Sequence, residues 1–295
     1  MTNQSDPYAR GADEQMSFRG AAIPFWLLHV AALGVFVVPF RWSNVGVFLV
    51  VYSLGTFGIM AGYHRYFSHR SYKTGRVFQF VLALLGTLTS QKGVLWWSGH
   101  HRHHHKHSDE ASDIHSPRRG FVWSHVLWFL APKYNETSAA QRREFERFPE
   151  LVFLNAHWVL GPVSLCVAML AIGGPSWLCW GGFLPIVAIW HATFSINSLA
   201  HVWGSRRYAT TDTSRNNAFL AVITFGEGWH NNHHHYQSSA RNGFFWWEID
   251  VTYYALKALS WAGVVWDLRT PPAWVLAGAS GPPREEVAAV VAPVA

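Results

Sequence analysis

Residues 21–62, AAIPFWLLHVAALGVFVVPFRWSNVGVFLVVYSLGTFGIMAG, consist of two apolar runs separated by the polar break Arg41-Trp42-Ser43-Asn44. The runs, 21–40 and 45–62, each approach the roughly 20 residues that a helix needs to cross a bilayer. Because so short a break forces the chain to reverse, this stretch predicts a hairpin of two membrane-spanning helices. Both outer ends of the hairpin are then expected on the same side of the membrane.

The same arrangement recurs later, where the apolar runs 151–172 and 177–200 flank the turn Gly173-Gly174-Pro175. A further apolar run, 77–89, is too short to span and predicts either a membrane-embedded or interfacial helix or a buried helix of the soluble part. The sequence therefore predicts an all-α membrane protein over residues 21–275, with four transmembrane helices arranged as two hairpins.

The basic residues indicate the orientation. Lys and Arg gather after each hairpin, whereas the two tight turns contain only Arg41. Since cytoplasmic segments carry the excess of Lys and Arg, both termini are expected on the cytoplasmic side. Segments 63–150 and 201–275 are expected to form a cytosolic helical cap that holds a di-metal site. The tails, 1–20 and 276–295, are expected to be flexible.

Composition supports a membrane environment. Of the 295 residues, 50% are hydrophobic and 14% charged, against about 25% charged in a typical soluble domain. The net charge of +6 favours lipid headgroups over nucleic acid, because it accompanies apolar spans. The only cysteines, Cys166 and Cys179, lie inside apolar runs, which argues against a disulfide framework and a thiolate metal site. The polar residues 1–19 and the long run after them indicate no cleavable signal peptide.

Many of the 18 histidines cluster where the predicted spans end. Two follow the second apolar run, and two His-x2-His-His boxes lie in the predicted cap. Asn197 and a histidine four residues later close the fourth run. The candidate metal ligands are His64, His69, His101, His104, His105, His201, His230, His233 and His234, with Asn197 as a further candidate.

The spacing of these histidines indicates a shared site. Residues at i, i+3 and i+4 share a helical face, so each box is expected to aim three imidazoles at one point. His64 and His69 lie about 140° apart on a regular helix. They either serve a common site where the helix ends or unwinds, or flank two metals from one side.

Nine imidazoles exceed the four ligands of a usual zinc site and suit two metals that keep open positions. Imidazole binds iron, copper, nickel and zinc alike. A di-iron centre best explains so many ligands beside hydrocarbon, because cleaving an unactivated C–H bond requires a strong metal oxidant.

The other histidines carry weaker expectations. His29 and His157 lie within apolar runs and are expected to be helix-packing residues, while His191 is expected in the core or along a tunnel. Four neighbours of the boxes are expected to face solvent or to support the ligands; His115 and His125 stay open. The four neighbours are His100, His103, His107 and His235.

Over residues 20–270 the sequence resembles the membrane fatty-acid desaturases, specifically the Δ9 (stearoyl-type) acyl branch. The matching text is Gly62–Lys73 (GYHRYFSHRSYK), His101–Lys106 (HRHHHK), Arg118–Val126 (RRGFVWSHV), Asn197–His201 (NSLAH) and Gly226–His234 (GEGWHNNHH).

The resemblance implies a di-iron centre held by the nine histidines, with Asn197 bridged through water. It also implies the reaction: O2 and two electrons remove two vicinal hydrogens from an acyl chain, leaving a cis double bond, and O2 is reduced to water. Four residues match positions that shape the bend of the acyl tunnel, namely Gln91, Trp97, Thr193 and Phe194.

Two departures leave the acyl carrier open. Gly99-His100 stands where acyl-CoA members have Arg-Asp, and Pro132-Lys133 stands where they have Arg-Lys. Acyl-lipid, acyl-ACP and acyl-CoA all remain candidate substrates. The sequence contains no His-Pro-Gly-Gly haem motif, so no fused cytochrome b5 domain is expected. A separate electron donor is expected, ferredoxin-, rubredoxin- or cytochrome b5-like, and the basic cap would steer an acidic partner.

Two kinds of rival function remain. The same metal scaffold supports hydroxylation, decarboxylation to an alkene, or acetylene formation, which spacing in the sequence does not distinguish. A metal transporter is the rival from a different class. It would place its ionisable ligands near the bilayer midplane, whereas here they gather at the ends of the predicted spans.

Overall fold

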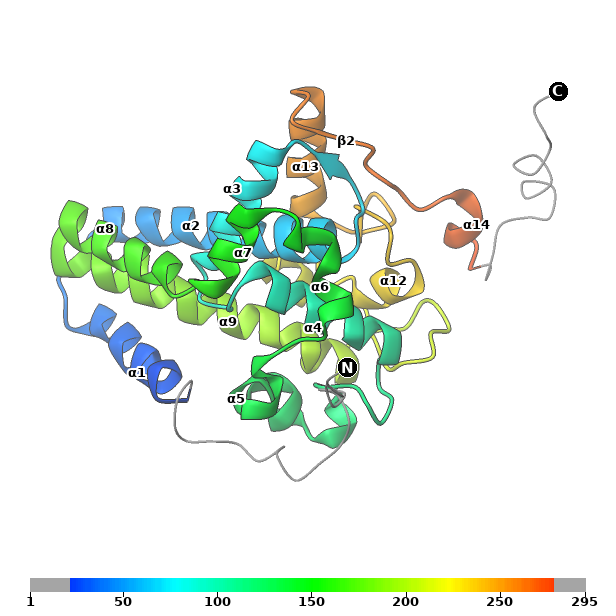
Figure 1. Cartoon of the computed structure of the whole chain (residues 1–295), viewed down its shortest axis with the longest axis horizontal. Helices are drawn as coiled ribbons and strands as arrows, with labels where there is room; N and C mark the ends of the chain where they lie inside the picture. Colours follow the sequence, from blue (N-terminus) through cyan, green and yellow to red (C-terminus); the bar gives the residue numbers. More distant parts are fainter. Residues whose placement is uncertain (1–21, 279–295) are drawn as a thin grey trace.

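The computed structural model describes residues 22–278, except for the side chains of residues 139–141 and 143, and it is predominantly helical (Figure 1). The predicted flexible tails fall outside the described residues except at 276–278, where Leu276 ends the last helix. The elements are α1 (Ala22–Ala32), η2 (Leu33–Phe36), α2 (Trp42–Phe57), η3 (Gly58–Ser68), β1 (Lys73–Thr74), α3 (Arg76–Thr87), α4 (Val94–His107), η4 (Pro117–Arg119), η5 (Trp123–Leu127), α5 (Trp128–Leu130), η6 (Pro132–Asn135), α6 (Ala139–Glu146), α7 (Pro149–Ala156), α8 (Leu160–Trp177), η7 (Leu178–Phe183), α9 (Leu184–Asn197), α10 (Leu199–Val202), α11 (Ala218–Ile223), α12 (His230–His235), α13 (Val251–Trp261), β2 (Val265–Trp266) and α14 (Ala273–Leu276).

The first predicted hairpin consists of α1 with η2 and of α2 with η3. Helix α2 begins at Trp42, inside the polar break, and continues without interruption into η3, which ends at Ser68. Figure 1 shows α1, α2, α8 and α9 extending together toward one end of the molecule. Their outward faces carry large exposed apolar side chains, among them Phe36, Trp42 and Val167. An apolar surface of this extent indicates contact with lipid.

The second hairpin differs from its predicted bounds at the start. The run predicted to begin at residue 151 is broken, because α7 ends at Ala156 and α8 begins only at Leu160. Proline lacks an N–H and disfavours helical backbone in the residue before it. Pro162 is therefore accommodated in the first turn of a new helix. The predicted turn is present at Gly174, whose φ of 63° and ψ of −159° reverse the chain.

Within residues 22–278, two helical stretches are long and apolar enough to cross a membrane, Trp42–Ser68 and Leu160–Val202. The second contains the reversal at Gly174, so its first half is shorter than the roughly 20 residues of a full crossing. The apolar helix Ala22–Phe36 is likewise short. These features, with the exposed apolar faces, support membrane association; the count of four spans stays a prediction.

The remaining helices gather around η3 and α4 at the other end of the molecule. The apolar run predicted at 77–89 is α3, which packs on η3 so closely that a Cβ on Gly58 would lie 2.5 Å from the Gly86 nitrogen. Every residue of η3 is buried, and it shares a core with α3, α4, α6 and α7. Strands β1 and β2 pair antiparallel, Lys73 with Trp266, and join the two halves of this cap.

Candidate metal centre

The structure brings all nine predicted histidines together in two groups. Within each group, the ring nitrogens that could bind a metal lie within 4.8 Å of one another. The first group, called group one below, is His64, His69, His101, His105 and His233, and group two is His104, His201, His230 and His234. Asn197 belongs to neither group, so its role as a water-bridged ligand stays a prediction.

A π-helix explains how His64 and His69 reach one group. In η3 the hydrogen bonds run from residue i to i+5, as in His69 N–H to the His64 carbonyl at 3.2 Å. A π-helix is wider than an α-helix and occurs frequently at functional sites. Residues five apart therefore fall on nearly the same face, and the two rings lie 4.8 Å apart between centroids.

The expectation that each box aims at one point is wrong. In α4, His101 and His105 belong to group one, whereas His104 belongs to group two. At about 100° per residue, i and i+4 differ by only about 40°, while i+3 lies about 60° to the other side of i. The box in α12 shows the same geometry. His230 and His234, at i and i+4, belong to group two, and His233, at i+3, belongs to group one. Each box therefore divides between the two groups.

The ring nitrogens in group one converge more tightly than hydrogen bonding explains. His233 Nε2 lies 3.0 Å from His64 Nε2 and 3.0 Å from His105 Nε2. A ring nitrogen carries either one proton or one lone pair, so His233 Nε2 cannot form a full hydrogen bond with both neighbours. In group two, His201 Nε2 and His230 Nε2 are 3.1 Å apart. Lone pairs brought together in this way fit a cation between them, and imidazole donors suit iron among other transition metals.

Acidic side chains orient four of the ligands. A carboxylate on Nδ1 holds the ring so that Nε2 faces the metal. The contacts from Nδ1 are His64 to Glu227 at 2.9 Å, His104 to Asp113 at 3.0 Å, His201 to Asp109 at 3.4 Å and His234 to Asp212 as a short hydrogen bond.

The protonation states of five of the nine ligands suit metal binding, which requires neutral imidazole. Burial lowers the pKa of five ligands well below the ordinary value, and neighbouring histidines lower it further. These five are His69, His101, His105, His230 and His233. Burial alone would raise the pKa of Asp212, but the hydrogen bond to His234 outweighs it and holds that pKa well below its usual range.

Replacing Asp212 by asparagine is expected to weaken metal binding in group two by about 10- to 100-fold, the usual cost of losing a supporting carboxylate. The amide has no charge to hold the His234 proton in place. Metal retained against increasing chelator measures the change. Asp267→Asn is the matched control, because Asp267 pairs with Lys73 at the surface. An affinity equal to the control's would show that Asp212 does not support the ligand.

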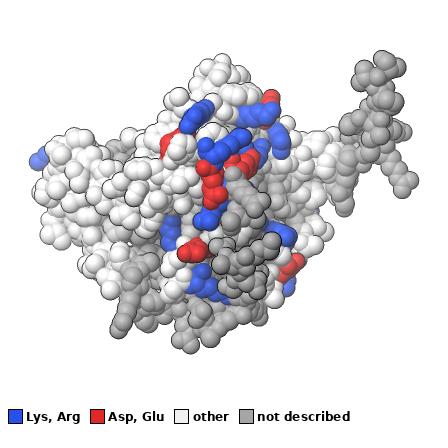
Figure 2. All heavy atoms as spheres, viewed as in Figure 1, with Lys and Arg blue, Asp and Glu red and all other residues white. Residues whose placement is uncertain are grey.

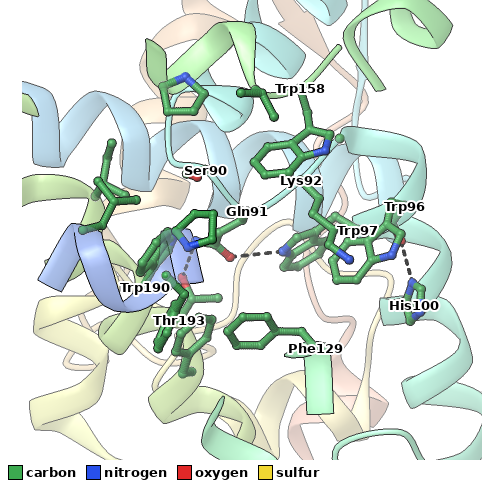
Figure 3. Close-up of a pocket in the computed structure, with 18 of the residues that line it drawn as sticks. Ser90, Gln91, Lys92, Trp96, Trp97, His100, Phe129, Trp158, Trp190 and Thr193 are labelled. Carbon is green, nitrogen blue, oxygen red and sulfur yellow. Dashed lines mark hydrogen bonds between the residues drawn. The ribbon is translucent and has the colours of Figure 1, made fainter. Parts of the chain in front are cut away.

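A cavity of about 870 Å³ runs beside group one and is lined by Gln91, Trp97, Thr193 and Phe194, the four predicted tunnel residues. Figure 3 shows three of them joined across the cavity. Gln91 Nε2 donates to Thr193 Oγ1 at 3.1 Å, and Trp97 Nε1 donates to Gln91 Oε1 at 3.3 Å. The Trp97 ring stacks on His101 at 4.9 Å. The tunnel role itself stays a prediction.

Two box neighbours do not face solvent, because His100 and His103 are only 2% and 5% exposed. His100 Nδ1 bonds the Trp96 carbonyl at 3.0 Å, and His103 Nε2 bonds the Ser112 carbonyl at 2.9 Å. His115, which the sequence left open, packs on His104 with ring centroids 4.2 Å apart.

Three histidines outside the groups form a chain between α1, α9 and η5. His29 Nε2 lies 2.9 Å from His191 Nε2, and His191 Nδ1 lies 3.0 Å from His125 Nε2. His125 Nδ1 then meets Ser198 Oγ at 2.9 Å. His29 is thus a polar link between helices as well as a packing residue.

Sequence reasoning missed the supporting carboxylates. The chain has only 17 acidic residues, yet Glu227 precedes the second box by three positions, and Asp113 follows His104 by nine. Because the chain has few charged residues, acidic residues this close to a histidine box could have indicated carboxylates that support the ligands. Asp212 had no such neighbour in the sequence.

Comparison with known proteins identifies what the chain is similar to. The family profile described as Fatty acid desaturase matches residues 40–269. The sn-1 stearoyl-lipid 9-desaturase of Anabaena variabilis is 40% identical over 248 residues, which cover 82% of this chain and 90% of that protein. Delta-9 acyl-lipid desaturase 1 of Arabidopsis thaliana is 38% identical over 79% of this chain and 77% of its own length. An acyl-CoA C20 Delta5-desaturase of Anemone leveillei is 34% identical over 84% and 82%, respectively.

Proposed function

The chain belongs to the fatty acid desaturase family and is a fatty-acyl desaturase, and on that premise we propose that it introduces a cis double bond at Δ9 of a lipid-bound acyl chain. Two irons held by the two histidine groups would supply, with O2 and two electrons, the oxidant that removes two vicinal hydrogens. The observation that carries the proposal is the apolar cavity lying directly against His101 of group one.

The protein's own part in this reaction is to place one segment of the acyl chain and to exclude water. Apolar side chains from α1, α8 and α9 form a large part of the cavity wall. Trp97, whose ring stacks on His101, forms a hydrogen-bonded set with Gln91 and Thr193. A fixed polar set in an apolar channel favours one position of the acyl chain. This set would therefore choose which carbons face the metals.

The cavity opening favours a membrane lipid as the carrier. Among the lining residues, Val159, which directly precedes α8, and Val163 and Val167 of α8 are also exposed, at 50%, 51% and 61%. The cavity thus opens sideways, between α8 and α1, toward the surface that would contact lipid. An acyl chain of a bilayer lipid could enter there without leaving the hydrocarbon.

Charge distribution supports the proposed orientation and indicates where a separate electron donor would dock. On the face shown in Figure 2, Lys and Arg gather over the cap, while the end formed by α1, α2, α8 and α9 is mostly uncharged. We place the cap and both termini on the cytoplasmic side. An acidic ferredoxin- or cytochrome b5-like protein would be steered to this face.

Lipid analysis tests the proposed function. The protein would be expressed in a host that makes only saturated acyl chains, and the lipids analysed by gas chromatography–mass spectrometry with derivatives that locate double bonds. We expect cis Δ9 monoenes on membrane lipids, and none in cells expressing His233→Ala. Hydroxy acids, 1-alkenes or acetylenes would instead assign one of the related oxidations, and a double bond elsewhere would overturn the Δ9 position.

A further inference from the structure

The cavity beside the metal centre contains one cationic side chain. Among the residues that line it, Lys92 is the only Lys, Arg, Asp or Glu. Lys92 lies in the connection between α3 and α4, and its Nζ donates to Asn135 Oδ1 at 3.0 Å. The ammonium also lies 4.3 Å from the centroid of the Trp96 ring; both side chains are labelled in Figure 3.

This charge is half-buried, and no carboxylate of the described residues is paired with it. Burial lowers the pKa of Lys92 to about 8, and no carboxylate of the described residues contributes to that shift. The ammonium therefore stays largely protonated at neutral pH. An ammonium has three N–H donors, and only one is used by Asn135. A charge that is partly withdrawn from water favours an anionic partner, so the half-buried Lys92 is suited to bind one.

The backbone holds Lys92 in place at a conformational cost. Its φ is 64°, a left-handed conformation that lysine rarely adopts, and Ser90 has a φ of 58°. The connection is fixed on both sides, since Tyr63 Oη donates to the Lys92 carbonyl at 3.3 Å and Trp190 Nε1 donates to the Thr89 carbonyl at 2.8 Å. Strained residues held by their surroundings concentrate at binding and catalytic sites.

The surroundings of Lys92 place it at the level of lipid headgroups. The cavity lining near it includes Asn135 and Asn155, together with Trp158, which lies two residues before the start of α8. The exposed valines of the sideways opening, Val159, Val163 and Val167, follow Trp158 in the sequence. Tryptophan concentrates where a membrane helix meets the interface. Lys92 therefore lies at the cap end of the opening, with the apolar channel beyond it.

We propose that Lys92 binds the phosphate of an acyl glycerophospholipid whose acyl chain occupies the cavity. This rests on the proposed function and adds a preference for anionic phospholipids over neutral glycolipids. A phosphate oxygen accepts the free N–H groups of Lys92 in a charge-assisted hydrogen bond, which a sugar hydroxyl matches only weakly. Phosphates of acyl-CoA or acyl-ACP share this chemistry, but the sideways opening favours a carrier that stays in the bilayer.

Competitive lipid binding tests the proposal. Native mass spectrometry would be performed on the iron-loaded protein with equimolar distearoyl-phosphatidylglycerol and distearoyl-monogalactosyldiacylglycerol. The wild type is expected to bind the phospholipid about tenfold more often, as one charge-assisted hydrogen bond allows. Lys92→Gln should reduce the ratio to near one, while Lys92→Arg should retain most of it. Lys257→Gln is the matched control, because Lys257 also faces a tryptophan, Trp261, but lies outside the cavity lining.

Each outcome decides between the alternatives. A wild type without preference, or a Lys92→Gln variant that keeps it, would overturn the phosphate site. If stearoyl-CoA displaces phosphatidylglycerol from the wild type but binds Lys92→Gln poorly, the phosphate site stands and the lipid carrier is overturned. Failure of the proposed function looks different, because then the wild type forms no monoene from either lipid. If the wild type desaturates both lipids and Lys92→Gln does not change the binding ratio, the proposed function stands and only the phosphate site at Lys92 is overturned.

Discussion

Replacing His233 by alanine is expected to abolish desaturation and to leave the purified protein with about one iron per chain instead of two. His233 contributes the ring nitrogen that lies between His64 and His105 in group one. Its loss removes a donor from the centre of the group, and the proposed reaction requires both metals. Activity should fall at least about 1000-fold, equivalent to about 4 kcal/mol of transition-state stabilisation. Iron analysis and monoene formation measure the two effects.

His107→Ala is the matched control for this prediction. His107 belongs to the same helix as one of the boxes, but it lies outside both groups and bonds Glu110 at 2.8 Å. The control should keep two irons and full activity. A His233→Ala protein that retains both irons, or a His107→Ala protein that loses them equally, would contradict the assignment of ligands.

Replacing Arg65 by methionine is expected to destabilise the folded protein by about 3–5 kcal/mol, the cost of leaving buried carboxylates without their partner. The Arg65 side chain is 1% exposed. Its Nε and Nη2 donate to Glu227 Oε1 at 3.0 and 2.9 Å, and Nη2 also lies 3.0 Å from Asp250 Oδ1. Nη1 donates to the Ala240 carbonyl at 2.7 Å. Methionine fills part of the volume but satisfies none of these groups.

Thermal unfolding in detergent measures this loss, with Arg76→Met as the control. Arg76 pairs with Glu150 at the surface, where its side chain is 62% exposed, and exposed ion pairs contribute little to stability. The melting temperature should fall sharply for Arg65→Met and hardly change for Arg76→Met. Equal shifts would show that the Arg65 cluster is not a stabilising centre of the cap.

The histidine positions could be predicted from the sequence because they depend on local spacing next to apolar runs. The division of each box between two groups could not, since spacing fixes the angle between side chains but not which neighbour each one meets. His104 meets His201 of α10 and His234 of α12, with ring centroids 5.8 and 5.4 Å apart, and both come from distant parts of the sequence. For His64 and His69, the spacing of five allowed either a common site or two metals flanked from one side. The π-helix places both residues in the same group.

Features that depend on contacts between distant segments had weaker signals or none. Asp212 supports His234 across 22 residues, and nothing near it in the sequence marks that contact. Lys92 likewise gave no signal, because its importance comes from lining a cavity that distant helices complete. The break before α8 was overlooked because apolar character continues across it; Pro162 was the residue that could have indicated it.

The central claim is that this desaturase holds two irons in two separate histidine groups. Anomalous diffraction from crystals of the iron-loaded protein, recorded on both sides of the iron absorption edge, tests it most directly. We expect two iron peaks, one surrounded by the nitrogens of His64, His69, His101, His105 and His233, and one by those of His104, His201, His230 and His234. A single peak, or peaks that persist below the iron edge and appear at that of zinc, would contradict the claim.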